Sequence, residues 1–68
     1  MNSDIILYNN LKKIRQAKKI SQEELAKMVG TTRQTIIAVE KGVYCPSAKL
    51  AYLLCIALQV SFEEAFYF

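Results

Sequence analysis

The chain has 68 residues, of which 53% are apolar, and 9 Lys and Arg against 6 Asp and Glu give it a net charge of +3. This length allows one small domain over residues 1–68, and the apolar fraction excludes a disordered chain. There is no His, so His-based catalysis and the commonest zinc sites are excluded, and we expect no enzyme, no metal and no cofactor.

The first predicted helix follows Asn9 or Asn10, either of which can cap it, and runs to about residue 19. Leu11, Ile14 and Ala17 recur every third residue and form an apolar stripe on this helix. The other face is basic and carries Lys12, Lys13, Lys18 and Lys19.

A second helix is predicted to begin at Ser21. Ser-Gln-Glu-Glu is a capping box, in which Ser21 and Glu24 exchange hydrogen bonds. We expect this helix to end at Gly30, because glycine turns the chain through positive φ without steric cost. The side chains expected to point inward are Leu25, Met28 and Val29.

A third helix is predicted over residues 33–41, with Thr32 as its N-cap and Gly42 as its stop. Only one or two residues separate it from Gly30. Two short helices joined by so tight a turn must cross at a steep angle.

Ser47 caps a fourth predicted helix, which runs to about residue 59 and is apolar nearly all round, as is typical of a helix buried on more than one face. Ser61 caps a short last helix. The two tails, residues 5–8 and 66–68, favour strand by residue type. We expect them to pair antiparallel, because free apolar termini normally fray.

The most specific pattern lies between Gln22 and Gly42. Its marker residues are Gln22, Ala26, Gly30, Ile36, Val39, Glu40-Lys41-Gly42 and, just beyond, Pro46-Ser47. Over residues 10–62 the chain resembles the helix-turn-helix of the Xre family, the Cro and phage-repressor type of DNA-binding domain. The resemblance implies an all-α, five-helix, lambda-repressor-like domain with its helix-turn-helix core at 21–42. The family's stand-alone dimeric repressors also have a small terminal β-sheet, which fits the expected antiparallel pairing of the two tails.

The third predicted helix carries the candidate DNA-reading face. At 100° per residue, Ile36, Val39 and Glu40 point one way and the reading face points the other. In the major groove Arg reads guanine, Gln reads adenine, and small apolar groups contact the thymine methyl. The candidate base-contacting residues are Thr32, Arg33, Gln34, Ile37 and Ala38; the alternative is a solvated face with two stray apolar residues.

Further residues are candidates for contacts with the DNA backbone. The resemblance places Gln22, at the start of the second helix, against a phosphate, whereas an exposed first-turn Gln is the alternative. The resemblance also implies a partly buried ion pair between Arg15 and Glu40, with Arg15 as a further phosphate contact. The full set is Gln22, Thr31, Thr35, Lys41, Arg15, Lys12 and Lys27; for each lysine a solvated charge is the alternative.

The apolar residues that follow the DNA-reading half predict a homodimer. One helix-turn-helix reads few base pairs, and such proteins place two recognition helices about 34 Å apart, one turn of DNA. The candidate interface, within about residues 50–68, comprises Tyr52, Ile56, Val60, Phe62, Phe66 and Phe68. Some of these six must fill the monomer core instead.

Together these features predict a sequence-specific transcriptional regulator, most often a repressor in this family. We expect it to bind a palindromic operator in double-stranded DNA as a homodimer, through the major groove. The alternative is an antitoxin-like or adaptor module whose main partner is another protein, which the apolar region 50–68 favours. After the DNA-binding module is counted, no residues remain for a small-molecule effector domain.

Location and redox state complete the expectations. The longest apolar stretch, residues 50–58, is far below the roughly 18 residues of a membrane span, and no secretory signal opens the chain. We therefore expect a cytoplasmic protein without membrane contact. Cys45 and Cys55 are too widely spaced for a zinc knuckle or a CxxC pair, so we expect both to be reduced and Cys55 to lie in the core. A redox switch at Cys45 is the alternative.

Overall fold

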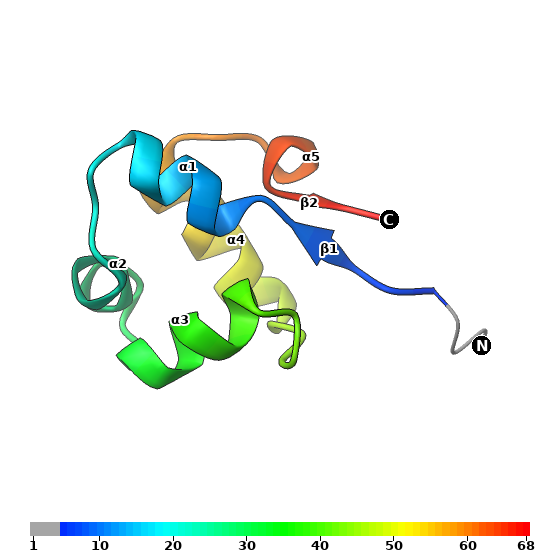
Figure 1. The fold of residues 1–68 in the computed structure, drawn as a ribbon, viewed down its shortest axis with the longest axis horizontal. Coiled ribbons are helices and arrows are strands. Elements are labelled where there is room, and N and C mark those ends of the chain that lie inside the picture. Colours follow the sequence, from blue (N-terminus) through cyan, green and yellow to red (C-terminus); the bar gives the residue numbers. More distant parts are fainter. Residues whose placement is uncertain (1–4) are drawn as a thin grey trace.

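In the computed structural model, which describes residues 5–68, the chain forms five helices and a two-stranded sheet (Figure 1). Their order is β1 (Tyr8–Asn9), α1 (Leu11–Ala17), α2 (Gln22–Val29), α3 (Arg33–Glu40), α4 (Ala48–Leu58), α5 (Phe62–Ala65) and β2 (Phe66–Tyr67). Each predicted helix is present, and α1, α3 and α4 end one or two residues earlier than expected. The predicted fold class is confirmed.

Four of the five helices begin at the caps that the sequence predicts. In each, a hydroxyl oxygen accepts a hydrogen bond from the backbone N–H three residues later; the capping residues are Ser21, Thr32, Ser47 and Ser61. α1 is the exception, because the side chain of Asn10 makes no capping bond. Asn9 Oδ1 instead accepts from the N–H of Leu11 at 3.1 Å.

Four helices end in the same left-handed turn. Lys19, Gly30, Gly42 and Gln59 have φ values of 59°, 75°, 79° and 57°, and in each case the next residue donates its N–H to the carbonyl five positions back. Gly30 and Gly42 are the two that the sequence predicts. At Lys19 and Gln59 a side chain occupies a conformation that costs roughly 1–2 kcal/mol in a residue other than glycine.

The core is formed by side chains from all five helices and β2, with Ala65 and Phe66 as the contributions of α5 and β2. The largest fully buried side chains are Leu11, Leu25, Ile36, Val39, Leu54 and Leu58. Cys55 is buried as predicted, and burial raises the pKa of its thiol.

The expectation that Met28 points inward is wrong, since its side chain is 54% exposed. The buried arc of α2 runs from Leu25 through Val29 to Ala26. Met28 lies about 60° beyond Leu25, on the side away from Ala26, so it faces solvent. The small Ala26 is buried in its place because α2 packs closely against its neighbours there.

One side of α4 remains open. α4 packs against α2 and α5, and Ala51, Leu54 and Leu58 are buried in those contacts. Tyr52 and Ile56, on the other side, are 68% and 59% exposed. A helix that is apolar nearly all round is therefore buried on its inner side and leaves an apolar outer side uncovered.

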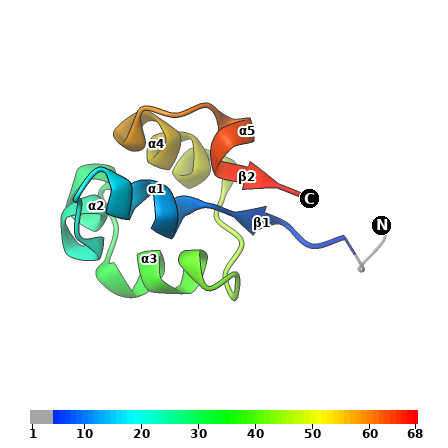
Figure 2. The same cartoon turned by 45° about the horizontal axis from the view of Figure 1, so that its top comes forward.

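The two tails pair as predicted, although over two residues each. Tyr8 lies opposite Tyr67 and Asn9 opposite Phe66 in an antiparallel ladder, and Figures 1 and 2 show β1 and β2 side by side. The rings of Tyr8 and Tyr67 stack with centroids 5.6 Å apart. Within residues 5–68, no helix is long and apolar enough to cross a membrane.

Candidate nucleic-acid interface

α2, the following turn and α3 form one packed unit. Gly30 turns the chain, and the N–H of Thr31 donates to the carbonyl of Ala26 at 2.9 Å, which closes the end of α2. Leu25 and Ile36 fill the space between the two helices and are at most 1% exposed. α3 thereby lies along one edge of the molecule, away from α5 and β2 (Figure 1).

α3 buries one face and presents the other. Ile36 and Val39 are buried, whereas Arg33 and Gln34 are exposed. The half-buried residues of this helix that belong to the predicted reading face are Ile37 and Ala38. The structure therefore brings the predicted base-contacting side chains together on the outer surface of α3.

Thr32 is a candidate base contact and is also the N-cap of α3. Its hydroxyl oxygen accepts the N–H of Thr35 at 3.2 Å and lies 3.0 Å from the Thr35 hydroxyl. Thr32 is exposed and Thr35 is half-buried. Both hydroxyls are thus held at the first turn of α3 before any ligand is bound.

A buried polar network fixes the inner side of α3 to α1 and α2. The carboxylate of Glu40 accepts from Arg15 Nε at 2.7 Å and from Arg15 Nη2 at 3.2 Å, and the two side chains are 3% and 8% exposed. Gln22 Nε2 donates to the same carboxylate at 3.1 Å, and Arg15 Nη1 donates to the carbonyl of Ile20 at 2.9 Å. One carboxylate therefore joins three helices, which confirms the expected ion pair.

This network gives Arg15 the structural role expected of it. Three of its nitrogens are engaged by Glu40 and Ile20, and the residue is 7% exposed. Three of the five guanidinium N–H groups are used in this way, which gives Arg15 a structural role, and its contact with the DNA backbone stays a prediction. Gln22 is half-buried and bonded to Glu40, which also rules out the alternative of a freely exposed first-turn Gln.

The other candidates for backbone contacts lie on several elements. Lys41 is exposed just after α3, Lys12 is exposed on α1, and Thr31 is half-buried in the turn. Lys27 is exposed on α2, where its Nζ lies 4.0 Å from Glu23 Oε1 in a solvated pair. Such exposed charges attract a polyanion at long range but contribute little to folding.

Val43 and Tyr44, in the loop after α3, are not among the residues predicted to contact DNA or a second copy of the chain. The N–H groups of Val43 and Tyr44 both donate to the carbonyl of Ala38, at 3.1 and 3.2 Å, which folds the following loop against the end of α3. Their side chains are 77% and 46% exposed. The sequence pattern that could have pointed to them is a pair of large apolar residues directly after Gly42, outside the apolar stripe of any predicted helix.

The candidate dimer residues divide into core and surface. Phe66 is 3% exposed and stacks on Phe62 with ring centroids 5.0 Å apart, so it belongs to the monomer core and its predicted place in an interface is wrong. Tyr52, Ile56 and Phe62 are at least 50% exposed, and with the half-buried Val60 they line a groove of about 310 Å³. We call this surface the α4–α5 face. Phe68, 80% exposed, lies outside it.

Comparison with known proteins gives consistent results. The family model described as Helix-turn-helix matches residues 11–64. An uncharacterized HTH-type transcriptional regulator of Methanocaldococcus jannaschii is 48% identical over 58 residues, which cover 85% of this chain and 88% of that protein. The uncharacterized HTH-type transcriptional regulator YgzD of Bacillus subtilis is 44% identical over 59 residues, covering 87% of this chain and 89% of that protein.

A solved structure extends the likeness to three dimensions. The restriction-modification controller protein C.AhdI from Aeromonas hydrophila superposes with a TM-score of 0.75 and 35% sequence identity, over 79% of this chain and 82% of that one. Two of these similar proteins are named as transcriptional regulators and the third as a controller protein, and none of the three is named as an enzyme.

Proposed function

We propose that this chain, which belongs to the Xre-type helix-turn-helix family of DNA-binding transcriptional regulators, represses transcription by binding a palindromic operator as a homodimer. The proposal adds three details to family membership: repression, a twofold operator and a dimer. Because its ligand is DNA, we expect it to act in the cytoplasm.

The outer surface of α3 carries the proposal. Gln34 and Arg33 are exposed there, and the Glu40 network holds the opposite side of the same helix. With α3 in the major groove, Gln34 pairs with adenine N6 and N7, and Arg33 with guanine O6 and N7. Ile37 and Ala38 contact thymine methyl groups. Each good bidentate pair discriminates against a wrong base by about 1–3 kcal/mol.

Phosphate contacts set the register of the protein on DNA. Gln22 begins α2, whose first backbone N–H groups point out of the helix end and attract an anion. One N–H of the Gln22 side chain is used by Glu40, and the other remains for a phosphate oxygen. We place Lys41, Thr31, Thr35, Lys12 and Lys27 in supporting contacts with the DNA backbone.

The α4–α5 face supports the homodimer. It presents Tyr52, Ile56 and Phe62 to solvent around one groove. Burial of such side chains against a second copy removes apolar area from water at about 25 cal/mol per Å². A twofold axis at this face makes a symmetric pair, and a symmetric pair reads a palindrome.

Binding-site selection tests the DNA part of the proposal. We expect the wild-type chain to select a palindrome. Gln34→Ala should relax the preference at one position of each half-site, because it removes a contact with a base edge. Lys41→Ala should weaken all sequences about equally and lower the salt dependence by about one ion, because it removes a phosphate contact. Binding that is salt-sensitive but indifferent to sequence would contradict the proposal.

A second function remains open because the exposed apolar side chains of the α4–α5 face suit a foreign protein as well as a second copy. In that case the chain is an antitoxin-like or adaptor module whose main partner is another protein. Size-exclusion chromatography with light scattering separates the two. A single symmetric dimer favours the repressor, whereas a monomer that aggregates at high concentration favours the interaction module.

A further inference from the structure

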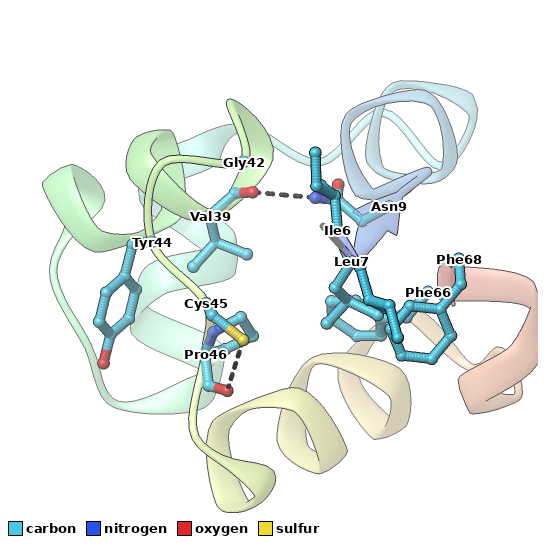
Figure 3. A pocket seen from close by; sticks show the side chains of 11 residues that line it. Ile6, Leu7, Asn9, Val39, Gly42, Tyr44, Cys45, Pro46, Phe66 and Phe68 are labelled. Carbon is cyan, nitrogen blue, oxygen red and sulfur yellow. Dashed lines mark hydrogen bonds between the residues drawn. The ribbon is translucent and has the colours of Figure 1, made fainter. Parts of the chain in front are cut away.

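Another apolar hollow lies between the two tails and the loop after α3. It has a volume of about 460 Å³, and we call it the tail cavity. Its walls come from the end of α3 and the loop, from the tail before β1, and from the last residues of the chain (Figure 3). The lining residues used below are Ile6, Val39, Cys45, Phe66 and Phe68.

Figure 3 shows the shape of this cavity. Val39 and Cys45 stand on one side, Leu7 and Phe66 on the other, and the space between them is open. Asn9 Nδ2 donates to the carbonyl of Val39 at 2.9 Å and so links β1 to α3. The cavity is therefore a gap between two anchored parts of the fold.

The chemistry of the walls limits what can bind. Among residues 5–68, no Lys, Arg, Asp or Glu lines the tail cavity. Its one side-chain amide, that of Asn9, is already engaged, because Nδ2 bonds Val39 and Oδ1 accepts from Leu11. No buried side-chain nitrogen or oxygen in this part of the chain lacks a partner. The other polar side-chain groups of the wall are the Tyr44 hydroxyl and the Cys45 thiol. A charged ligand therefore finds no opposite charge among these side chains, whereas an uncharged apolar ligand needs none.

Size and position favour a small molecule over a second copy of the chain. Pockets for small ligands usually measure about 300–1,000 Å³ and are mostly apolar. A cavity of about 150 Å³ holds one benzene ring, so the tail cavity accommodates roughly 12 to 18 non-hydrogen atoms. It shares no lining residue with the groove of the α4–α5 face, so a second copy that fills that groove does not use the walls of the tail cavity.

We propose that the tail cavity is a binding site for an uncharged, apolar small molecule. The site lies within the DNA-binding domain itself and needs no separate effector domain. The ligand would contact Val39 and Gly42, at the end of the helix that we place in the major groove, as well as both tails.

A pair of matched probes tests the chemistry of this site on the full chain. N-phenyl-1-naphthylamine is uncharged, and 1-anilinonaphthalene-8-sulfonate carries a negative charge on the same ring system. Fluorescence titration should show saturable binding of the uncharged probe at one site per chain, and at least about tenfold weaker binding of the sulfonate. Absence of saturable binding, or equal affinity for both probes, would overturn the proposal.

Two pairs of variants locate the bound probe. Cys45→Phe adds bulk at the cavity wall, and Val43→Phe adds the same ring in the same loop outside it. Ile6→Lys places a charge at the wall, and Met28→Lys places one at an equally exposed position on α2 that lines neither hollow. All four positions are exposed, so the core stays intact, and thermal unfolding followed by circular dichroism checks this.

We expect the two cavity variants to weaken binding of the uncharged probe at least about tenfold, and the two controls to change it by less than about twofold. Unchanged binding in both Cys45→Phe and Ile6→Lys would place the probe elsewhere and refute the tail cavity as the site. The titration contains no DNA, so its outcome is independent of the repressor proposal.

Discussion

The helix-turn-helix unit, residues 21–42, and the remainder of the molecule differ in how many large apolar side chains they expose to solvent. Within residues 21–42, Met28 is the one large apolar side chain that is strongly exposed. The remainder of the described chain exposes ten; these are Ile5, Ile6, Tyr8, Val43, Tyr44, Tyr52, Ile56, Phe62, Tyr67 and Phe68. The first region is complete as a monomer, and the second has apolar surface left to cover.

This difference separates two kinds of recognition. α3 is held rigidly by a buried carboxylate and by apolar packing, which suits a helix that must present polar groups to DNA at fixed positions. The α4–α5 face and the tail cavity are apolar and have little hydrogen-bonding capacity of their own. They suit partners that are recognised by shape and burial.

The largest effect is expected from breaking the network that holds the helix-turn-helix unit. Arg15→Ala leaves Glu40, 3% exposed, without its main partner. We expect a loss of about 3–5 kcal/mol in the free energy of unfolding, measured with urea. Lys27→Ala breaks an exposed pair in the same unit and should cost about 0.5 kcal/mol or less. Similar losses of stability for the two variants would contradict the view that the buried pair stabilises the fold much more than the exposed pair.

The next effect concerns the apolar half. Ile56→Glu places a charge on the α4–α5 face, so we expect the dimer to dissociate and operator affinity to fall at least about tenfold. Met28→Glu is the matched control, because Met28 is exposed to a similar extent on α2. Light scattering should find Met28→Glu dimeric and Ile56→Glu monomeric. If Ile56→Glu is still a dimer, the interface does not lie on the α4–α5 face.

A smaller gain is expected at the helix ends. Gln59→Gly removes the steric cost of a left-handed residue and should raise the free energy of unfolding by about 1 kcal/mol, with the same sign for Lys19→Gly. Gly30→Ala, at the equivalent turn of the helix-turn-helix unit, should lower it. Thermal unfolding of the three variants checks the signs, and a destabilised Gln59→Gly would show that its side chain has a role we have not assigned.

The smallest effect depends on pH and is shared by both halves. The backbone N–H of Ser21 donates to Glu24 Oε1 at 3.0 Å and, with the Ser21 hydroxyl, lowers the pKa of Glu24 below its ordinary value of 4.5; Ser61 lowers the pKa of Glu64 in the same way. A lowered pKa in the folded state contributes stability that is present above 4.5 and is lost as the pH falls through the lowered value.

Glu24→Gln and Glu64→Gln keep a hydrogen-bond acceptor but remove the titration. We therefore expect each to flatten the loss of stability in acid, measured as the unfolding midpoint in urea between pH 6 and pH 3. An acid-induced loss as steep as that of the wild type would contradict the assignment.

The features that are predicted correctly from the sequence are those that depend on a few neighbouring residues. The capping box at Ser21, the caps at Thr32 and Ser61 and the turn at Gly30 each depend on three or four neighbouring residues, so they can be recognised before any packing is known. The predicted reading face of α3 follows from helix period alone, once the inward position of Ile36 is recognised.

Tertiary packing decides the rest. The sequence cannot say that Phe66 fills the core while Phe62 does not, because both are aromatic and four residues apart. The engagement of Arg15 depends on a carboxylate 25 residues away and on the carbonyl of Ile20. The tail cavity is made by segments from both ends and the middle of the chain, which no local pattern brings together.

The short pairing of β1 with β2 also sets the order in which the molecule opens. Two strands of two residues each form the weakest kind of sheet, and they join segments from opposite ends of the described chain. Local opening of this sheet separates Tyr8 from Tyr67 and leaves α2 and α3 intact. In native-state hydrogen exchange we therefore expect the tail amides to exchange first and those of the helix-turn-helix unit to follow only on global unfolding.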